Sequence, residues 1–203
     1  MDELTLLDWK RRVFALYSDV RADPEPERAW RRWREVRNEL FREHPQSPLT
    51  AKARATFTGL PYFDYDPVAR VVATVDPAPA ERREIATSGE HPYAFRRFAR
   101  AAFELGGVEL GLDLYWLEGY GGGLFLSFAD ATSGKETYGA CRYLLDTVKG
   151  ADLGEQNGML VLDFNFAYNP SCSYDPRWVC PLSPPANRLP LRVAAGERMP
   201  GAG

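Results

Sequence analysis

The sequence predicts a mainly β protein: an antiparallel sandwich or partly closed barrel, with N-terminal helices and a long C-terminal proline-rich strap. Three observations support this class. Apolar residues recur at helical spacing only near the start of the chain. From residue 50 onward, short β-rich runs are separated by Gly, Pro and Asp. The last part has many prolines and little periodicity. We therefore expect one domain (1–203), with a helical arm (1–45), a β body (50–168) and a strap (169–203).

Composition places the chain among ordinary globular proteins. Hydrophobic residues make up 45% and charged residues 26%, and the formal net charge is 25 − 28 = −3. These values exclude a disordered chain, a fibrous repeat and a disulfide-dense miniprotein. No stretch has the roughly 18–20 uncharged apolar residues of a membrane span, and the first residues do not resemble a secretory leader. With an odd number of cysteines, three, we expect a reduced, cytoplasmic protein with no membrane partner.

Two helices are predicted in the arm. The first, over residues 2–17, has one apolar stripe at helical spacing, made of Leu6, Trp9, Val13 and Tyr17. The second, over residues 24–41, has an apolar side made of Ala29, Trp33, Val36 and Leu40. Asp23 is expected to be its N-cap. The helix should end near His44, because Pro45 disfavours helical geometry in the residue before it.

Strands are predicted in the β body over residues 69–75, 108–117, 124–128 and 159–164. In residues 108–117, strict alternation of side-chain types predicts one buried and one wetter face. Residues 93–105 fit either a helix, by the spacing of their aromatic residues, or a hairpin strand, because Gly106 and Gly107 follow directly. Strands and helices do not alternate along the chain, so a doubly wound nucleotide-binding fold is not expected.

Charge is unevenly distributed. Residues 28–42 hold six arginines against two glutamates, and residues 101–169 hold ten acids against three bases. We interpret the basic helix as a solvated face that packs against the acidic body. Docking of a partner through this helix is the alternative, and a homo-oligomer stays open. The net negative charge and the lack of a second basic patch argue against nucleic acid as a partner.

His44, in HPQSPL, and His91, in GEHPYAF, are the two histidines. No G-x-S-x-G element is present, so a Ser–His–Asp triad on a nucleophile elbow is not expected. Ser47 lies three residues after His44, but on a proline-broken loop this spacing does not aim one side chain at the other. A hydrogen-bonded structural role is the simpler reading of His44, and a functional role is the alternative.

Cys172 and Cys180 are separated by seven residues, a spacing that indicates neither a thioredoxin-like motif nor a zinc ribbon. Buried free thiols are the favoured interpretation. The alternatives are a zinc site completed by His44, a disulfide, or a catalytic thiol. A fourth zinc ligand is not evident, so no metal ligand is assigned and the cofactor stays unknown. Cys141 is expected to fill the core.

The densest polar cluster spans residues 130–144. Ser133 and Glu136 have capping-box spacing, which predicts a helix start or a tight turn. Arg142 stands among tyrosines and leucines, and a buried guanidinium must pair with a carboxylate, stack on a ring or receive an anion. We expect pairing with one of three acids: Asp130, Asp163 or Glu197. In residues 162–174, polar Asp163, Asn165 and Asn169 either point into a cavity or cap the following turn.

Over nearly its whole length the sequence resembles the family called domain of unknown function 1684. The shared elements are HPxSPL (44–49), GLxYF with a following Asp-Pro (59–67), FxDxTSGxETYGxxRYL (128–144), LDFNxAYNPxCxY (162–174), CPxPPxNxLP (180–190, with Ser183 in place of one proline) and AGE (195–197). The resemblance implies a mostly β body, which favours a strand over residues 93–105. It also implies that certain polar residues belong to family motifs: His44, Asp130, Thr137, Tyr138, Arg142, Asn165, Asn169, Cys172 and Cys180. It implies no particular reaction.

We expect the β body to enclose a pocket for a small polar or anionic molecule, lined by Arg142 and Tyr138, with His44 at its rim. The candidate catalytic residues are His44, Arg142 and Cys172. The candidate ligand-binding residues are Ser47, Asp130, Thr137, Tyr138, Tyr143, Asn165 and Asn169. One alternative is a hydrolase or lyase that uses His44 with Cys172 or a bound metal. The other is a non-enzymatic interaction protein that docks through the basic helix 28–42. The sequence alone does not decide between an enzyme and a binding protein.

Overall fold

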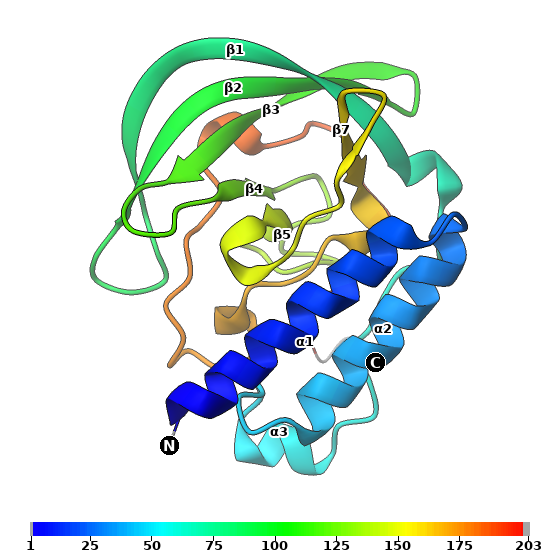
Figure 1. Cartoon of the computed structure of the whole chain (residues 1–203), viewed down its shortest axis with the longest axis vertical. Helices are drawn as coiled ribbons and strands as arrows, with labels where there is room; N and C mark the ends of the chain where they lie inside the picture. The colour runs from blue at the N-terminus through cyan, green and yellow to red at the C-terminus, as the bar shows by residue number, and fades with distance from the viewer. Residues whose placement is uncertain (1, 201–203) are drawn as a thin grey trace.

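The computed structural model describes residues 2–200. Two long helices, α1 (Asp2–Ala22) and α2 (Pro26–Glu43), pack against each other, and a short helix α3 (Ala51–Ala55) follows. In Figure 1, α1 and α2 lie side by side across the open side of a strongly curved sheet. None of the helices in the described residues has the length and hydropathy to cross a membrane.

The sheet has seven strands in the order β5-β4-β3-β2-β1-β7-β6, and each neighbouring pair is antiparallel. The strands are β1 (Arg70–Ile85), β2 (Tyr93–Leu105), β3 (Val108–Leu117), β4 (Leu124–Phe128), β5 (Arg142–Asp146), β6 (Glu155–Gln156) and β7 (Met159–Asp163). The first three strands arch over the molecule (Figure 1). The result is an antiparallel half-barrel, which corresponds to the predicted partly closed barrel and not to the sandwich.

Residues 93–105 form a strand, so the helical interpretation of this segment is wrong. Every second side chain of β2 faces the core, including Phe95, Ala99 and Phe103. Gly106 and Gly107 connect β2 to β3 with φ angles of 60° and 79°. Two consecutive left-handed residues make the tight turn whose twist matches an antiparallel hairpin. The Gly-Gly signal therefore outweighs the helical spacing of the aromatic residues.

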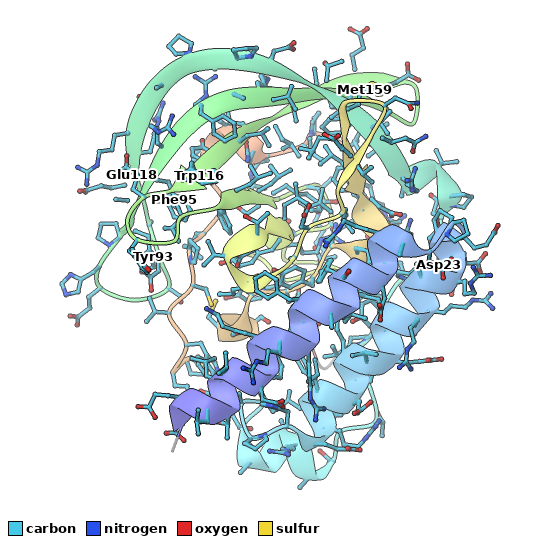
Figure 2. All side chains as sticks on the ribbon, in the orientation of Figure 1. Asp23, Tyr93, Phe95, Trp116, Glu118 and Met159 are labelled. Carbon is cyan, nitrogen blue, oxygen red and sulfur yellow. The ribbon has the colours of Figure 1, made fainter. Side chains whose placement is uncertain are left out.

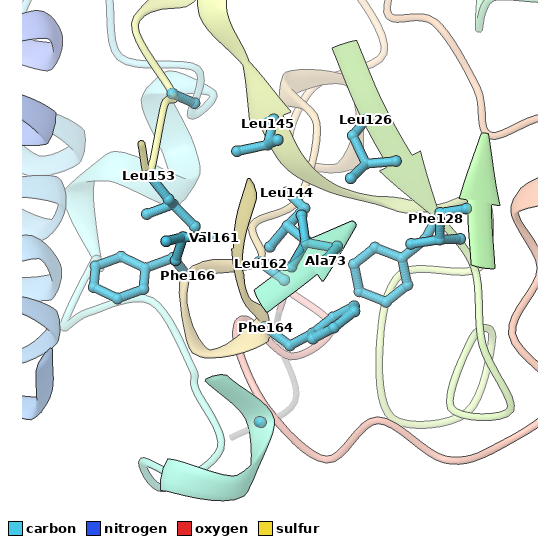
Figure 3. Close-up of a cluster of buried hydrophobic side chains, with 14 of the residues drawn as sticks. Ala73, Leu126, Phe128, Leu144, Leu145, Leu153, Val161, Leu162, Phe164 and Phe166 are labelled. Atoms are coloured by element: carbon cyan, nitrogen blue, oxygen red, sulfur yellow. The ribbon is translucent and has the colours of Figure 1, made fainter. Parts of the chain in front are cut away.

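The main core lies between the helices and the sheet. Trp33 of α2 is 0% exposed, and its ring centroid lies 5.2 Å from that of Phe166 and 5.7 Å from that of Tyr62. Deeper in the sheet, the Phe128 and Phe164 rings meet edge to face at 5.1 Å. Figure 3 shows this part of the core, where side chains of β1, β4, β5 and β7 converge. The stripe predicted for the second helix is therefore mostly buried, whereas in the stripe of the first helix Tyr17 is buried and Leu6 is 47% exposed.

Several element boundaries differ from the prediction. Helix α1 continues five residues beyond residue 17, to Ala22. The N-cap of α2 is Glu25 and not Asp23, whose carboxylate instead accepts from the Glu25 amide at 2.8 Å and pairs with Arg28 at 2.6 Å. Strand β5 was not predicted, because all five of its residues are buried and no alternation marks it.

The C-terminal segment, residues 169–200, contains two short 3₁₀ turns (Ser171–Ser173 and Pro185–Asn187) and no strand. Asn187 is fully buried. Its side-chain nitrogen donates to the carbonyl oxygens of Asp113 at 3.0 Å and Ser127 at 2.9 Å, and its side-chain oxygen accepts from the Asp113 amide at 2.8 Å. One asparagine therefore ties this segment to β3 and β4.

Candidate functional site

Arg142 is engaged by acceptors of the protein itself. Its side chain is 1% exposed. The guanidinium donates to the carbonyl oxygens of Ala195 and Val193 and to Oδ1 of Asp130 at 3.4 Å, and it lies 4.9 Å above the Phe128 ring. Burial lowers the pKa of Arg142 to about 10, and Asp130 opposes that shift, so the side chain is cationic at neutral pH. The expected ion pair with Asp130 is confirmed, and Arg142 anchors residues 193–195 to β5.

The rest of the polar cluster supports the same turn. Asp130 Oδ2 accepts from the Val193 amide at 2.7 Å, and Asp130 Oδ1 accepts from the Thr132 hydroxyl at 2.8 Å. The Thr132 and Thr137 hydroxyls are 2.7 Å apart. Ser133 accepts from the Asp130 amide at 3.1 Å, and no helix begins here. Asp130 and Thr137 thus fold the loop between β4 and β5, where the capping-box spacing marks a turn.

His44 lies on the helical side of the molecule. Its Nδ1 accepts from the Gln46 amide at 3.0 Å, which leaves the proton on Nε2 to donate to Asp8 Oδ2 at 3.2 Å. Ser47 donates to the Phe41 carbonyl at 2.6 Å. The depression beside His44 is lined by residues of α1, α2 and the turn after α2, and Arg142 is not among them. The stretches around His44 and Arg142 therefore do not share the hollow that the sequence analysis expected.

The two asparagines of the LDFNxAYNP element hold loops. Asn165 Nδ2 donates to the Asp66 carbonyl and to Asp163 Oδ1, both at 2.8 Å, and Asn165 Oδ1 accepts from the Asp66 amide at 2.9 Å. Asn169 Nδ2 donates to the Arg198 carbonyl at 2.7 Å. The asparagines therefore hold segments distant in sequence and do not cap the following turn. Asp163 has that role, since its Oδ1 accepts from the Asn165 amide at 3.0 Å.

Cys172, Cys180 and Tyr138 form a small cluster of sulfur and hydroxyl groups. Both cysteines are free; Cys172 is partly exposed and Cys180 is buried. The Cys172 amide donates to Cys180 Sγ at 3.4 Å, and the Tyr138 hydroxyl lies 3.9 Å from Cys172 Sγ. The described hydrogen bonds of His44 and Cys172 do not join them. Within residues 2–200, no three His, Cys, Asp or Glu side chains gather as a metal site would require.

The basic helix carries less free charge than its sequence indicates. Arg28, Arg31 and Arg32 pair with Asp23, Glu27 and Glu35, respectively, at 2.5–3.5 Å. Arg34 and Arg37 turn inward, with their guanidinium carbons 4.5 Å from the Trp30 ring centroid and 4.8 Å from that of Trp33. Packing against aromatic rings and pairing within the helix therefore account for most of this arginine cluster.

An apolar pocket of about 190 Å³ opens at one end of the half-barrel. Its floor is the aromatic pair Phe95 and Phe125, with ring centroids 5.0 Å apart, and both side chains are buried. Figure 2 labels Tyr93 and Phe95 at this end of β2. The pocket is lined by Tyr93, Phe95, Leu117, Phe125, Asp146, Val148, Lys149, Val179 and Pro181.

Two charged residues of the lining set the electrostatics of this pocket. Lys149 Nζ lies 3.7 Å from Asp146 Oδ2; the lysine side chain is 58% exposed and the aspartate side chain 9%. Burial raises the pKa of Asp146, and Lys149 opposes that shift. An exposed ammonium on a flexible stem can reach an anion at the mouth of the pocket. Tyr143 of the predicted set acts here indirectly, because its hydroxyl donates to the Pro181 carbonyl at 2.5 Å and so positions the rim.

A smaller cavity of about 90 Å³ lies between the helices and β5. Arg37, Tyr143, Tyr168 and Asn169 contribute to its lining, and Asn169 Oδ1 has no hydrogen-bond partner among the described side chains and backbone groups. Most of the other lining residues are aromatic or aliphatic.

Together these features define an antiparallel β half-barrel protein, closed on its open side by a helical hairpin and hollowed by an apolar pocket at one end. The chain belongs to the family described as protein of unknown function DUF1684, whose sequence model matches residues 55–198. Among solved structures, the solution NMR structure of an uncharacterized protein of Haloarcula marismortui is similar. The two chains share 35% identity and a TM-score of 0.61, over 84% of this chain and 92% of the other. A search of the curated proteins finds no match.

Proposed function

We propose that this protein binds a small molecule with an apolar body and an anionic group in the pocket at the end of the half-barrel. The observation that carries the proposal is the composition of this pocket. Its floor is aromatic, its walls are leucine, valine and proline, and Lys149 is the base among its lining residues. Apolar walls with a few placed polar groups are typical of small-ligand sites.

The pocket volume limits the size of the ligand. A dry cavity of about 150 Å³ in another protein accommodates benzene, and the present pocket measures about 190 Å³. A single aromatic ring or a short branched chain therefore fits, with its charged end toward solvent and Lys149. Such a ligand buries too little surface for tight binding, and we expect dissociation constants in the range of about 0.1–1 mM.

This proposal keeps the anionic ligand class expected from the sequence but moves its recognition from Arg142 to Lys149. Arg142 donates to Asp130 and to two carbonyl oxygens and is 1% exposed. Lys149 also pairs with a carboxylate, that of Asp146 at 3.7 Å, but its side chain is 58% exposed and can reach a ligand. Residues 169–200 serve as the strap in this proposal, because Val179 and Pro181 form one wall of the pocket.

Benzoate and benzamide are suitable probes, because they share a ring and differ in charge. We expect benzoate to shift the NMR signals of Leu117 and Val179 and to bind about two- to fivefold more tightly than benzamide, as one partly exposed ion pair allows. Lys149→Gln should abolish this preference. Lys135→Gln is the matched control, since Lys135 is exposed in the loop between β4 and β5.

A second variant tests the location of the site. Val179 is 48% exposed at the rim, so Val179→Trp should fill the pocket without disturbing the core. Loss of benzoate binding in this variant supports the pocket. Unchanged benzoate affinity in Val179→Trp, or an unchanged preference in Lys149→Gln, would refute the proposal.

A further inference from the structure

Cys172 and Cys180 contact each other at a place in the fold that does not line the proposed ligand pocket. The eight-residue step between them folds back, so that the Cys180 sulfur accepts from the Cys172 amide at 3.4 Å. This contact places the side chain of Cys180 directly against the backbone of Cys172. The two cysteines are thus close together in space, as a disulfide between them would require.

The two thiols are chemically unequal. Cys172 is partly exposed, whereas Cys180 is 2% exposed. Hydrogen bonds from the Cys180 thiol, and then from Ser88 and Tyr138, lower the pKa of Cys172 to about 6 despite its partial burial. The hydrogen bond to Cys172, together with burial, raises the pKa of Cys180. An accessible thiolate beside a buried thiol is the arrangement of a nucleophilic cysteine with a resolving cysteine.

The third cysteine provides an internal comparison. Cys141 is 0% exposed, and burial raises the pKa of its thiol to about 12. Its sulfur lies 4.0 Å from the Pro181 carbonyl oxygen. Cys141 is therefore close to the pair in the fold but has neither the exposure nor the ionisation of Cys172.

The loop between the two cysteines is tied to the HPxSPL element. Arg177 donates to the Ser47 carbonyl at 3.4 Å, and the Trp178 indole donates to the Pro48 carbonyl at 3.3 Å. Ser88 holds the second cysteine, since its hydroxyl accepts from the Cys180 amide at 3.0 Å. These bonds hold residues 177–180, the second half of the loop, in place.

We propose that Cys172 and Cys180 are a redox-active dithiol that exchanges with small soluble disulfides. In the first step the Cys172 thiolate attacks one sulfur of the external disulfide, a mixed disulfide forms, and one thiolate leaves. In the second step Cys180 loses its proton to that thiolate and attacks Cys172 Sγ, which releases the second half as a thiolate that takes a proton from water. The dithiol is oxidised to a disulfide, and the external disulfide is reduced to two thiols.

The test incubates the folded, reduced protein with glutathione disulfide at neutral pH and follows the intact mass. We expect the wild-type protein to lose two hydrogens, and peptide mapping to show a Cys172–Cys180 link. Cys180→Ser should instead retain one glutathione at Cys172, and Cys172→Ser should stay unmodified. Cys141→Ala is the control and should form the same internal link as the wild type.

Alkylation with a limiting amount of reagent compares the reactivity of the three thiols within one protein. With limiting iodoacetamide at pH 7, we expect Cys172 to react about tenfold or more faster than Cys141 and Cys180. Equal labelling of the three cysteines would overturn the proposal. So would a wild-type protein that keeps both thiols in excess glutathione disulfide, or one that stops at the glutathione adduct. The wild-type peptide map decides the matter even where a cysteine variant does not fold.

Discussion

Arg37 of α2 and Glu197 of the C-terminal segment form an ion pair inside the protein, with Nη2 2.9 Å from Oε2. Their side chains are 13% and 0% exposed. Glu197 also accepts from the Tyr174 hydroxyl and from the Asn169 amide, and Arg37 donates to the Tyr62 hydroxyl at 3.1 Å. Residues distant in sequence are thus joined at one point between the helices and the sheet.

Removing one member of this pair should be costly. Glu197→Gln leaves the Arg37 charge buried without its counter-charge, and we expect the free energy of unfolding to fall by about 3–5 kcal/mol. Urea denaturation measures the change. The matched control is Glu27→Gln, which breaks the exposed Arg31–Glu27 pair and should cost no more than about 1 kcal/mol. Equal losses in the two variants would contradict the prediction.

Arg142 should behave as a structural residue. Arg142→Lys keeps the charge but cannot reach Asp130, Val193 and Ala195 together, so at least one buried carbonyl loses its donor. We expect a loss of about 2–4 kcal/mol in the free energy of unfolding and unchanged benzoate affinity of the folded protein. Arg188→Lys, at an exposed position, is the control. A stable Arg142→Lys variant that no longer binds benzoate would return anion recognition to Arg142.

Asp163 should make the folded state less stable as the pH rises. Burial raises its pKa from 3.8 to about 6, while hydrogen bonds from Asn165 oppose the shift. Between these values the native state binds more protons than the unfolded state, so stability is lost as the pH rises through the interval. The two-unit difference corresponds to about 3 kcal/mol at most.

Asp163→Asn should remove this dependence. Its Oδ1 can still accept from the Asn165 amide and side chain, as Asp163 Oδ1 does. We expect the stability difference, variant minus wild type, to become more favourable by about 2 kcal/mol between pH 4 and pH 8. Chemical denaturation at both pH values measures the difference, and a difference independent of pH would show that Asp163 titrates normally.

Tyr138 should help to keep Cys172 ionised. Its hydroxyl lies 3.9 Å from Cys172 Sγ, and a donor that hydrogen-bonds a thiolate stabilises the charged form. We expect the midpoint of Cys172 alkylation, near pH 6 in the wild type, to rise by about 0.5–1 pH unit in Tyr138→Phe. Tyr120→Phe is the control, because Tyr120 is fully exposed in a turn. An unchanged midpoint in Tyr138→Phe would mean that Cys180 and Ser88 alone hold the thiolate.

Local patterns predicted most of the fold. The helical stripes and the Gly-Gly turn each act over a few residues, and the structure contains the corresponding helices and hairpin. Residues 108–117 form the predicted strand, but the predicted alternation of a buried and a wetter face is wrong, because four consecutive residues, 112–115, are buried. Strand β5 was not predicted from the sequence, because Arg142–Asp146 is buried on both faces and shows no alternation of apolar and polar residues. Arg142, the charged residue at its start, pairs with Asp130 and donates to two carbonyl groups about fifty residues away. No local sequence pattern predicts those two long-range contacts.

The pocket could not be predicted in the same way. Its lining comes from β2, β3, β4, β5 and the C-terminal segment, and most of these residues are ordinary apolar side chains with no motif. The sequence motifs instead indicated polar residues as candidate ligand contacts. Buried polar groups, however, are more often hydrogen-bonded to other parts of the protein. Asp130, Thr137 and Asn165 are examples, since each is saturated by neighbouring backbone or hydroxyl groups.

The curved sheet does not close on itself, and its borders differ in how much free backbone they offer. Strand β1 pairs with β7 only over Arg70–Ala73, so among the described residues no strand covers that edge of residues 74–85, where Pro77 and Pro79 interrupt the row of amides. Strand β6 has two exposed residues, Glu155 and Gln156. On the opposite border, Tyr143 exchanges backbone hydrogen bonds with Tyr168, and Asp146 does so with Ala151. Amyloid-like growth and strand swapping need an unpaired row of amides and carbonyls to template the next chain. The two prolines and the charged side chains of β1 oppose such pairing at its free edge. Folded copies of this protein should therefore resist polymerisation by strand addition, and any assembly they form should be held by side chains.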